Sequence, residues 1–474
     1  MKKFLSFPFF TSPFLWGIYG ILLVFLANYW NFNGLYGQDA YEYYRCYCEL
    51  GRNKMCHFPI QYPIWAKSLG LFFSAQNALQ IWAMLAAVAS LFYVEKFLRL
   101  FSENFTQIRL FVLIFGASSL YFSRLSLCIM SDTTAIFFCI AGAYHSYCYV
   151  EKEGKRIDLV FGLLLLLNAV LTRYATIFLV TLPSLISLYF ALKRKEAKAL
   201  ALTFGVAAFF VGLSFLLKNN YFTSAGQHTL LVNWDWRQML GQQFTNASDG
   251  SGAYAQPNFI FYLLFFLHPA YIAWGSLFFV GTFFTFRGIS KMQMLFLFVP
   301  AFCYWLFLAG SYHQGIRLLL LIFPHLLIFY FPAFQWISQK CKPYFSQKAL
   351  TFILLLTCMV QWAIFPFATK KMRQWNEVET EIAQRLKQQL PPTATIYTLG
   401  MEGVLFAHEL PQKTISLYGD TLTSVENEAF ILIQTAVFAK QWKNLLPEKN
   451  LQFLRQQQPF TVKDSFDLGW KLYH

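Results

Sequence analysis

Long apolar runs, separated by short polar segments, dominate the first 368 residues of the chain. About 20 apolar residues are needed for a helix to cross a hydrocarbon core roughly 30 Å thick. Eleven runs approach this length, and we expect each to form a membrane-spanning helix. Their approximate ranges are 14–30, 69–94, 108–122, 133–150, 159–171, 175–192, 199–217, 259–286, 292–310, 318–337 and 349–367. The pattern therefore predicts an all-α polytopic membrane protein over residues 1–368.

The pattern changes after residue 368. An amphipathic helical stretch at 376–390 is followed by two prolines and then by short apolar runs at 394–400 and 428–434. Helical and strand-like segments that alternate in this way are typical of a small α/β domain. We therefore expect a transmembrane module over 1–368 and a C-terminal α/β domain over 369–474.

Composition supports a membrane protein and excludes several other classes. Hydrophobic residues make up 57% of the chain and charged residues only 13%, whereas an ordinary soluble domain is about a quarter charged. The net charge of +15 comes from short basic clusters between the apolar runs rather than from one continuous basic face. A soluble enzyme, a disordered scaffold and a nucleic-acid-binding protein are therefore poor interpretations.

The basic clusters also predict the orientation of the helices. Placing the N-terminus in the cytoplasm puts the clusters at 96–99, 151–156, 193–198, 287–291 and 339–348 on the cytoplasmic side. That side then carries 17 Lys and Arg residues, against nine on the other side. The same alternation places two loops, at about 31–68 and 218–258, and the C-terminal domain on the non-cytoplasmic side.

Several charged residues lie at the non-cytoplasmic ends of the predicted spans, where an unpaired charge is costly. The basic ones are Arg124, Arg173, Lys218 and Arg317. Guanidinium groups suit phosphate oxygens, so these residues could hold an anionic ligand. The alternative is interhelical ion pairing, for instance between Arg124 and Asp132. For Arg317 we favour the ligand, because His313 adds a polar group just before its apolar run.

The first non-cytoplasmic loop holds the strongest candidate for catalysis. Asp39 follows the first span closely and is surrounded by tyrosines. A carboxylate at the membrane interface can act as a general base, and aromatic rings often hold sugars. The alternative is a helix cap, because Asp39 and Glu42 have the spacing of a capping box.

Two further groups of residues in these loops are open to more than one interpretation. Trp234 and Asp235 could contact an acceptor or a sugar, although a tryptophan at this depth is more often an interface anchor. Cys46, Cys48 and Cys56 precede His57, but their spacing does not fit a structural zinc site. A disulfide between two of these cysteines is favoured if the compartment is oxidising.

In order and spacing, several segments resemble the GT-C glycosyltransferases, and most closely the branch with protein O-mannosyltransferases and the lipid A aminoarabinose transferase. The resemblance begins with the acidic first loop and spans nearly the whole chain. The other segments are HFPIQYPIWAKSLGLFF at 57–73, SSLYFSRLSLCIMSDTTAIFF at 118–138, LLLLLNAVLTRYATIFLVTLP at 163–183, SYHQGIRLLLLIFPHLLIFY at 311–330 and the closing GWKLYH.

This resemblance implies an inverting transfer of a sugar from a polyprenyl-phosphate donor at the non-cytoplasmic face of the membrane. Asp39 would be the catalytic base and Asp132 a second acid. The residues implied to hold the donor phosphate are Arg124, Arg173, Arg317 and His313. The candidate contacts to acceptor or sugar are Glu42, Tyr43, Tyr62, Trp234 and Asp235. The first loop reads D-A-Y-E rather than the D-x-D or D-E of some members, so this motif does not support a divalent metal; we assign no metal ligand and no other cofactor.

The implied partners are the polyprenyl-phosphate-linked sugar, the lipid bilayer and a protein, lipid or glycan acceptor. The absence of a long non-cytoplasmic insert favours a bacterial inner membrane, with the active site facing the periplasm. The alternatives are a secondary transporter or a flippase for lipid-linked sugars, and an O-antigen ligase or polymerase. Charges gathered at span ends, rather than at mid-membrane, favour the transferase over the transporter.

Overall fold

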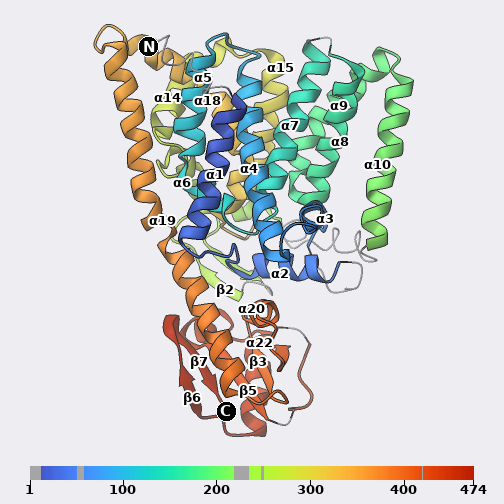
Figure 1. The fold of residues 1–474 in the computed structure, drawn as a ribbon, viewed down its shortest axis with the longest axis vertical. Coiled ribbons are helices and arrows are strands. Elements are labelled where there is room, and N and C mark those ends of the chain that lie inside the picture. Colours follow the sequence, from blue (N-terminus) through green and yellow to red (C-terminus); the bar gives the residue numbers. More distant parts are fainter. Residues whose placement is uncertain are drawn as a thin grey trace.

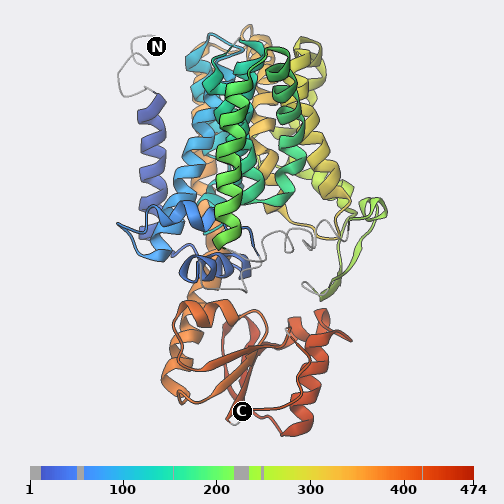
Figure 2. The same ribbon diagram turned by 90° about the vertical axis from the view of Figure 1, so that its right-hand side faces the viewer.

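The computed structural model describes residues 12–50, 58–152, 154–217, 234–246, 250–418, 420–426 and 428–474. Residues 51–57 and 218–233 of the two predicted loops lie outside this part of the chain, and with them Cys56, His57 and Lys218. The described chain forms a layer of upright helices with a small sheet domain at one end, as Figures 1 and 2 show. We call this end of the helical layer the domain end.

The helical layer is built from the apolar part of the chain, because a helix satisfies its own backbone groups where water is absent. Two short helices, α2 (Gln38–Cys48) and α3 (Gln61–Lys67), lie at the domain end (Figure 1). The other helices of this part are α1 (Ser12–Tyr29), α4 (Ala75–Leu98), α5 (Phe105–Phe111), α6 (Leu120–Ser126), α7 (Asp132–Glu151), α8 (Arg156–Thr172), α9 (Ile177–Lys193), α10 (Ala197–Leu217), α13 (Asn258–Leu267), α14 (Gly275–Thr285), α15 (Lys291–Gln293), α16 (Val299–Ala309), α17 (Ile316–Leu319), α18 (Phe323–Cys341) and α19 (Gln347–Gln389).

Six helices within the described residues are long and apolar enough to cross a membrane, and a bent pair would make a seventh. The polytopic helical prediction is therefore correct in kind, but the predicted number of eleven spans is not confirmed. The six are Ala75–Leu98, Tyr174–Lys193, Ala197–Ser214, Lys291–Ala309, Ile316–Cys341 and Lys348–Gln389.

Two runs predicted as single spans are interrupted. The run at 108–122 bends by 72° between Phe105–Ala117 and Leu120–Ser126. At this bend the Ser119 side chain accepts a hydrogen bond from the Phe122 amide and so caps the second helix. The run at 259–286 is divided into α13 and α14, because Pro269 follows the end of α13 and cannot continue a helix.

Helix α19 joins the helical layer to the sheet domain. It contains 43 residues and is therefore about 64 Å long at 1.5 Å per residue, twice the thickness of a hydrocarbon core. Its apolar first half corresponds to the predicted span at 349–367, and its polar second half continues toward the sheet domain (Figure 1). The predicted span and the predicted amphipathic helix at 376–390 are thus one continuous helix.

The C-terminal domain contains a five-stranded sheet in the order β4-β3-β5-β7-β6, which agrees with the predicted small α/β unit. Strands β3, β4 and β5 are parallel, while β7 is antiparallel to both β5 and β6. The strands are β3 (Thr395–Thr398), β4 (Lys413–Ser416), β5 (Ala429–Gln434), β6 (Val462–Ser465) and β7 (Trp470–Tyr473), and the helices are α20 (Glu402–Ala407), α21 (Thr435–Gln441) and α22 (Leu446–Gln457).

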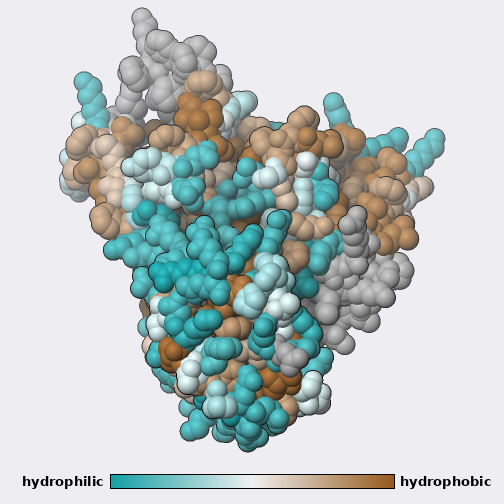
Figure 3. Space-filling model, turned by 60° about the horizontal axis from the view of Figure 1, so that its bottom comes forward, coloured by the Kyte–Doolittle hydropathy of each residue, from teal (hydrophilic) through white to brown (hydrophobic). Residues whose placement is uncertain are grey.

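The two parts of the molecule differ in surface character. Figure 3 shows mostly hydrophilic side chains over the C-terminal domain and hydrophobic ones gathered on the flanks of the helical layer.

A hairpin of β1 (Gln243–Asn246) and β2 (Gly250–Ala253) extends from the layer and contacts α21, where the Ser251 hydroxyl donates to the Gln441 carbonyl over 3.4 Å. The polar domain and the apolar layer therefore meet at the domain end.

Candidate active site

Four predicted site residues form a continuous chain of ion pairs at the domain end. Arg317, in α17, pairs with the Asp39 carboxylate of α2. Its Nε atom also lies 3.7 Å from Asp132 Oδ2. Arg173 Nη1 lies 2.6 Å from Asp132 Oδ1. The structure thus brings together residues from positions 39, 132, 173 and 317 in the order Asp39–Arg317–Asp132–Arg173.

Helix ends explain where two of these charges lie. Asp132 is the first residue of α7, where the helix dipole favours a negative charge, and Arg173 is the C-cap of α8, where it favours a positive one. The Asp132 side chain has no exposed surface, so its charge has to be compensated by neighbouring charges. Arg173 and Arg317 provide this compensation from two sides.

Asp39 is held in its charged form by its surroundings. Burial alone would raise the pKa of Asp39, but the Arg317 guanidinium, with contributions from Arg173 and His313, outweighs burial and lowers it. The side chain is still 31% exposed, so it can be reached from solvent. The alternative interpretation of Asp39 as a helix cap is wrong, because the N-cap of α2 is Gly37, whose positive φ of 74° suits glycine.

Tyr43 and Tyr62, two of the predicted sugar contacts near Asp39, have hydroxyl groups that already form hydrogen bonds within the protein. The Tyr43 hydroxyl is hydrogen-bonded to Ser131 Oγ over 2.6 Å, and its ring meets the ring of Tyr62 edge-on, with centroids 5.2 Å apart. The Tyr62 hydroxyl donates to the Leu79 carbonyl over 2.9 Å, and the side chain is fully buried. Tyr43 therefore packs beside Ser131, the neighbour of Asp132 in sequence, and Tyr62 packs against Tyr43.

Glu42, one turn after Asp39 on α2, remains an acid of interest. Burial raises the pKa of Glu42, an effect that Arg45 opposes and the Glu402 carboxylate strengthens. Glu402 belongs to α20 of the C-terminal domain and was not predicted. Nothing in the sequence around residue 402 indicates this neighbour, because the two residues meet only when the domain packs on α2.

The loop before Arg317 is fixed by two tyrosines that were also not predicted. The Tyr262 hydroxyl donates to the His313 carbonyl over 2.9 Å and accepts from the Gly315 amide over 3.2 Å. The Tyr254 hydroxyl donates to the Tyr312 carbonyl over 3.1 Å and accepts from the Gln314 amide over 3.0 Å. Loop 311–315 is thereby held immediately before Arg317.

Arg124 stands next to the ion-pair chain without joining it. Its guanidinium lies over the ring of Tyr36, 5.3 Å from the centroid. Asp132 pairs with Arg173 and Arg317, and the described residues contain no ion pair between Arg124 and Asp132. The interhelical pair that we considered for Arg124 is therefore not formed.

Trp234 and Asp235 lie at the Gly310 turn, where both polar groups are engaged. The Trp234 indole N–H donates to the Phe307 carbonyl over 3.0 Å. The Asp235 amide donates to the Gly310 carbonyl over 3.0 Å, and its carboxylate accepts from the Arg237 amide over 2.9 Å. These contacts anchor the segment to the helical layer just before loop 311–315.

The C-terminal domain packs directly on the helix that carries Asp39. A Cβ atom added to Gly403 of α20 would lie 2.4 Å from Tyr41 Cβ, so only glycine fits there. The rings of Tyr44 and Phe406 meet edge-on at 6.4 Å, and the Arg45 guanidinium lies 5.5 Å from the Phe406 centroid. The domain therefore covers one face of α2.

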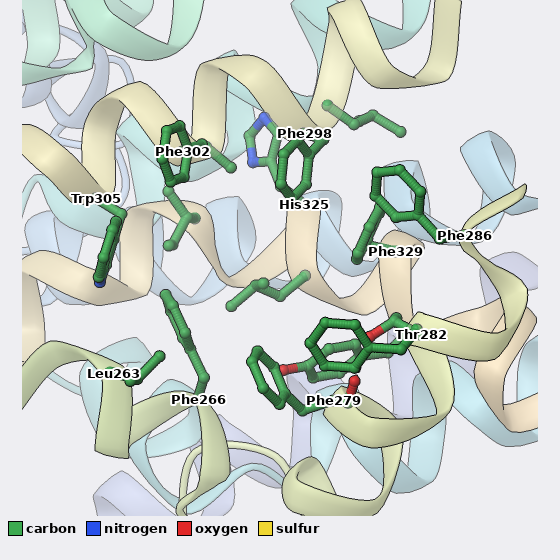
Figure 4. A pocket seen from close by; sticks show the side chains of 16 residues that line it. Leu263, Phe266, Phe279, Thr282, Phe286, Phe298, Phe302, Trp305, His325 and Phe329 are labelled. Atoms are coloured by element: carbon green, nitrogen blue, oxygen red, sulfur yellow. The ribbon is translucent and has the colours of Figure 1, made fainter. Parts of the chain in front are cut away.

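Within the helical layer, an apolar cavity of about 300 Å³ lies between α13, α14, α16 and α18. Figure 4 shows the rings of Phe266, Phe279, Phe298 and Phe329 arranged around it. His325 Nδ1, at this cavity, is buried without a hydrogen-bond partner among the described residues. The cavity suits a flexible hydrocarbon chain rather than a polar molecule.

The described residues contain no group of three or more His, Cys, Asp or Glu side chains that could hold a metal ion. The Asp39 and Asp132 carboxylates are paired with Arg317 and Arg173 instead.

Comparison with known proteins places this fold. Neither the known protein-family models nor the curated proteins contain a match to the sequence. Among solved structures, apo ArnT from Cupriavidus metallidurans matches with a TM-score of 0.63 at 11% identity, over 98% of both chains. The same protein bound to undecaprenyl phosphate matches with a TM-score of 0.59 at 13% identity, over 96% of this chain and 97% of that one.

These matches show that the chain shares its fold with ArnT, in line with the fold expected from the resemblance in the sequence. More particularly, the arrangement of helices and C-terminal sheet is that of ArnT over nearly the whole length of both chains. At this level of identity the likeness concerns the fold, so activity has to be argued from the site.

Proposed function

We propose that this chain is an integral membrane glycosyltransferase that moves a sugar from a polyprenyl-phosphate donor to an acceptor on the non-cytoplasmic face of the membrane. The observation that carries this proposal is the chain Asp39–Arg317–Asp132–Arg173, where a reachable carboxylate stands beside a partly exposed arginine that also approaches the fully buried Asp132. The fold shared with ArnT, one structure of which holds undecaprenyl phosphate, supports the same class of donor.

The charges of the site favour an anionic ligand. Within the ion-pair chain two acids balance two arginines, and Arg124 adds a further positive charge that no described carboxylate pairs with. A phosphate group would therefore compete with Asp39 for the Arg317 guanidinium, since both are oxyanions that suit its geometry. Asp132 would keep Arg173 as its partner.

This competition connects donor binding to catalysis. When Arg317 turns to the donor phosphate, Asp39 loses the cation that lowers its pKa and becomes a better proton acceptor. Asp39 then takes the proton from the acceptor hydroxyl as the acceptor oxygen attacks the anomeric carbon. The bond from that carbon to the phosphate oxygen breaks, and the arginines stabilise the charge of the leaving phosphate. A single displacement of this kind inverts the anomeric configuration.

Two observations support the non-cytoplasmic location of the site. Cys46 of α2 is disulfide-bonded, and disulfides persist in oxidising compartments rather than in the cytosol. By the positive-inside rule the basic clusters mark the cytoplasmic ends of the helices, and the four residues of the ion-pair chain fall at the opposite ends in that topology. A bacterial inner membrane with the site facing the periplasm fits both observations.

The apolar cavity provides a place for part of the donor's lipid chain. Ile322 lines it and lies five positions after Arg317, so the cavity begins close to the proposed phosphate position. A cavity of about 150 Å³ holds one benzene molecule, so 300 Å³ corresponds to roughly two isoprene units. The acceptor would enter from the side of Glu42 and the C-terminal domain.

The proposal is tested by incubating the purified protein in lipid with a panel of polyprenyl-phosphate sugars carrying a radiolabel. We expect sugar transfer, or slow release of the sugar to water, with at least one donor. Binding of the donor without any chemistry would contradict the proposal and favour a flippase for lipid-linked sugars.

A further inference from the structure

Tyr41 and Glu379 link the helix that carries Asp39 to helix α19. We propose that they form a positioning pair, which sets the orientation of α2 and thereby places the Asp39 carboxylate beside Arg317. This inference rests on the proposed function, because its readout is turnover of the donor. It assigns a catalytic consequence to α19 and to the C-terminal domain, neither of which contributes to the ion-pair chain.

The pair is a buried hydrogen bond between distant parts of the sequence. The Tyr41 hydroxyl donates to Glu379 Oε2 over 2.7 Å. The Tyr41 side chain is 2% exposed and that of Glu379 is 4% exposed, so water cannot readily replace either partner. Breaking such a bond leaves a buried polar group unsatisfied, which is more costly than losing an exposed hydrogen bond.

Helix geometry makes this bond relevant to Asp39. Residues two positions apart on a helix point about 200° away from each other, so Asp39 and Tyr41 project from nearly opposite faces of α2. Asp39 reaches Arg317 on one side, and Tyr41 reaches Glu379 on the other. A rotation of α2 that withdrew Asp39 from Arg317 would therefore also break the Tyr41 hydrogen bond.

A second contact from α19 secures the segment that leads into α2. The Asn376 side-chain amide donates to Asn33 Oδ1 over 2.8 Å and to the Leu35 carbonyl over 3.1 Å. Asn376 lies one turn before Glu379, so both residues are on the same side of α19. Helix α19 thus holds two points of the first loop, at 33–35 and at Tyr41.

The segment that these contacts hold contains two glycines with positive φ angles. Gly34 and Gly37 have φ angles of 82° and 74°, and residues in this region of conformational space are most often glycine. Glycine also leaves the unfolded backbone more freedom than other residues do, so the entry to α2 depends on tertiary contacts for its orientation. Asn376 and Glu379 supply such contacts from α19, while Gln76 and the Ile129 amide donate to the Asn33 and Gly34 carbonyls over 2.8 Å each.

The pair also connects the C-terminal domain to the site. The polar half of α19 leads into that domain, whose helix α20 packs against Tyr41 through Gly403. Any movement of the domain relative to the helical layer therefore acts on α2 from two directions. The position of Asp39 depends on where the C-terminal domain lies.

The test compares four variants of the full-length protein in lipid: Tyr41→Phe, Glu379→Gln, Glu379→Leu and Tyr397→Phe. Tyr397 is the matched control, because it is a buried tyrosine of the C-terminal domain whose hydroxyl accepts a hydrogen bond from the Glu426 amide over 3.0 Å, away from α2. Donor turnover supplies kcat and KM, and the melting temperature Tm reports folding.

We expect Tyr41→Phe to lower kcat by about ten- to a hundredfold, the loss typical of a small misplacement of a catalytic group. The KM for the donor should stay within about threefold, because the arginines remain in place. Glu379→Gln should keep kcat close to that of the wild type, since its amide oxygen still accepts from Tyr41. Glu379→Leu should lower kcat as Tyr41→Phe does, because it removes the acceptor. Tyr397→Phe should lower Tm and leave kcat unchanged.

The double variant Tyr41→Phe with Glu379→Leu separates positioning from general damage. If the two residues act as a pair, its kcat should be no lower than that of the worse single variant. With an active wild type, three results would overturn the inference. The kcat losses of the two single variants could multiply in the double variant, Tyr41→Phe could leave kcat unaffected, or Tyr397→Phe could lower kcat as much as Tyr41→Phe does. A wild type without turnover of any donor would overturn the proposed function and this inference with it.

Discussion

The carboxyl group of Glu379 leads to a prediction with a defined sign and size. Burial raises the pKa of Glu379 from an ordinary value of 4.5 to about 7, and the hydrogen bond from Tyr41 only partly opposes burial. The residue lies in the polar half of α19, well past the apolar run at 349–367. The pKa difference of about 2.5, at 1.36 kcal/mol for each pKa unit, corresponds to about 3 kcal/mol of folding free energy.

The sign follows from which state holds the proton more tightly. Because the folded protein has the higher pKa, its free energy of unfolding is reduced progressively as the pH rises from about 4.5 to about 7. Glu379→Gln has no proton to lose and avoids this reduction. We therefore expect the variant to be more stable than the wild type by up to about 3 kcal/mol at about pH 8, and of similar stability at about pH 4.5.

The assay follows the Tm of both proteins in the same lipid nanodiscs, by tryptophan fluorescence, across this pH range. Glu381→Gln serves as the control, because Glu381 is on the same helix but 46% exposed and paired with Arg385. Its Tm curve should run parallel to that of the wild type. A Glu379→Gln curve that also runs parallel to the wild type, or a lower Tm at about pH 8, would refute the reasoning.

Three further predictions concern the site itself. Arg173→Leu leaves the buried Asp132 with a single distant partner and should destabilise the protein by about 3–5 kcal/mol, seen as a lower Tm; an unchanged Tm would contradict this. Arg317→Ala should weaken binding of undecaprenyl phosphate by at least about tenfold in a ligand-induced Tm titration, and equal affinity would remove Arg317 from the phosphate site. Tyr262→Phe releases loop 311–315 and should lower kcat several-fold with a small loss of Tm, whereas an unchanged kcat would show that the loop needs no such support.

The members of the charged site could be predicted from the sequence, but their pairing could not. Asp39, Asp132, Arg173 and Arg317 stand out because charged residues beside apolar runs are costly unless they are functional or paired. Their order in space depends on how four helix ends pack, which no local pattern encodes. For that reason Arg124, which is as basic as the others, could not be separated from them in advance.

Asn376, Glu379 and Glu402 were not predicted, for a different reason. Asn376 and Glu379 belong to an amphipathic stretch rich in charged residues, where a polar side chain normally faces solvent. Packing of α2 and of the segment before it against α19 buries both of them. Glu402 was missed because it approaches Glu42 only after the C-terminal domain has docked on α2.

The helical layer was predictable in kind and less so in detail. Apolar runs indicated spanning helices, because long stretches of apolar side chains favour the hydrocarbon core of a membrane. The bend between α5 and α6 lies inside an unbroken apolar run, so no change of hydropathy marks it. Pro269 does mark the division between α13 and α14 in the sequence. The run at 259–286 was nevertheless predicted as a single span, because it is apolar over its whole length.

Asp39 is proposed as the base of a sugar transfer, and one measurement tests this role most directly. Wild-type protein and Asp39→Asn, matched for expression and Tm in lipid, are compared for release of radiolabelled sugar from the donor that the wild type uses. Loss of general base catalysis should lower the rate by about a hundredfold or more while donor binding is retained. A variant that transfers sugar at the wild-type rate would contradict the assignment of Asp39 as the base.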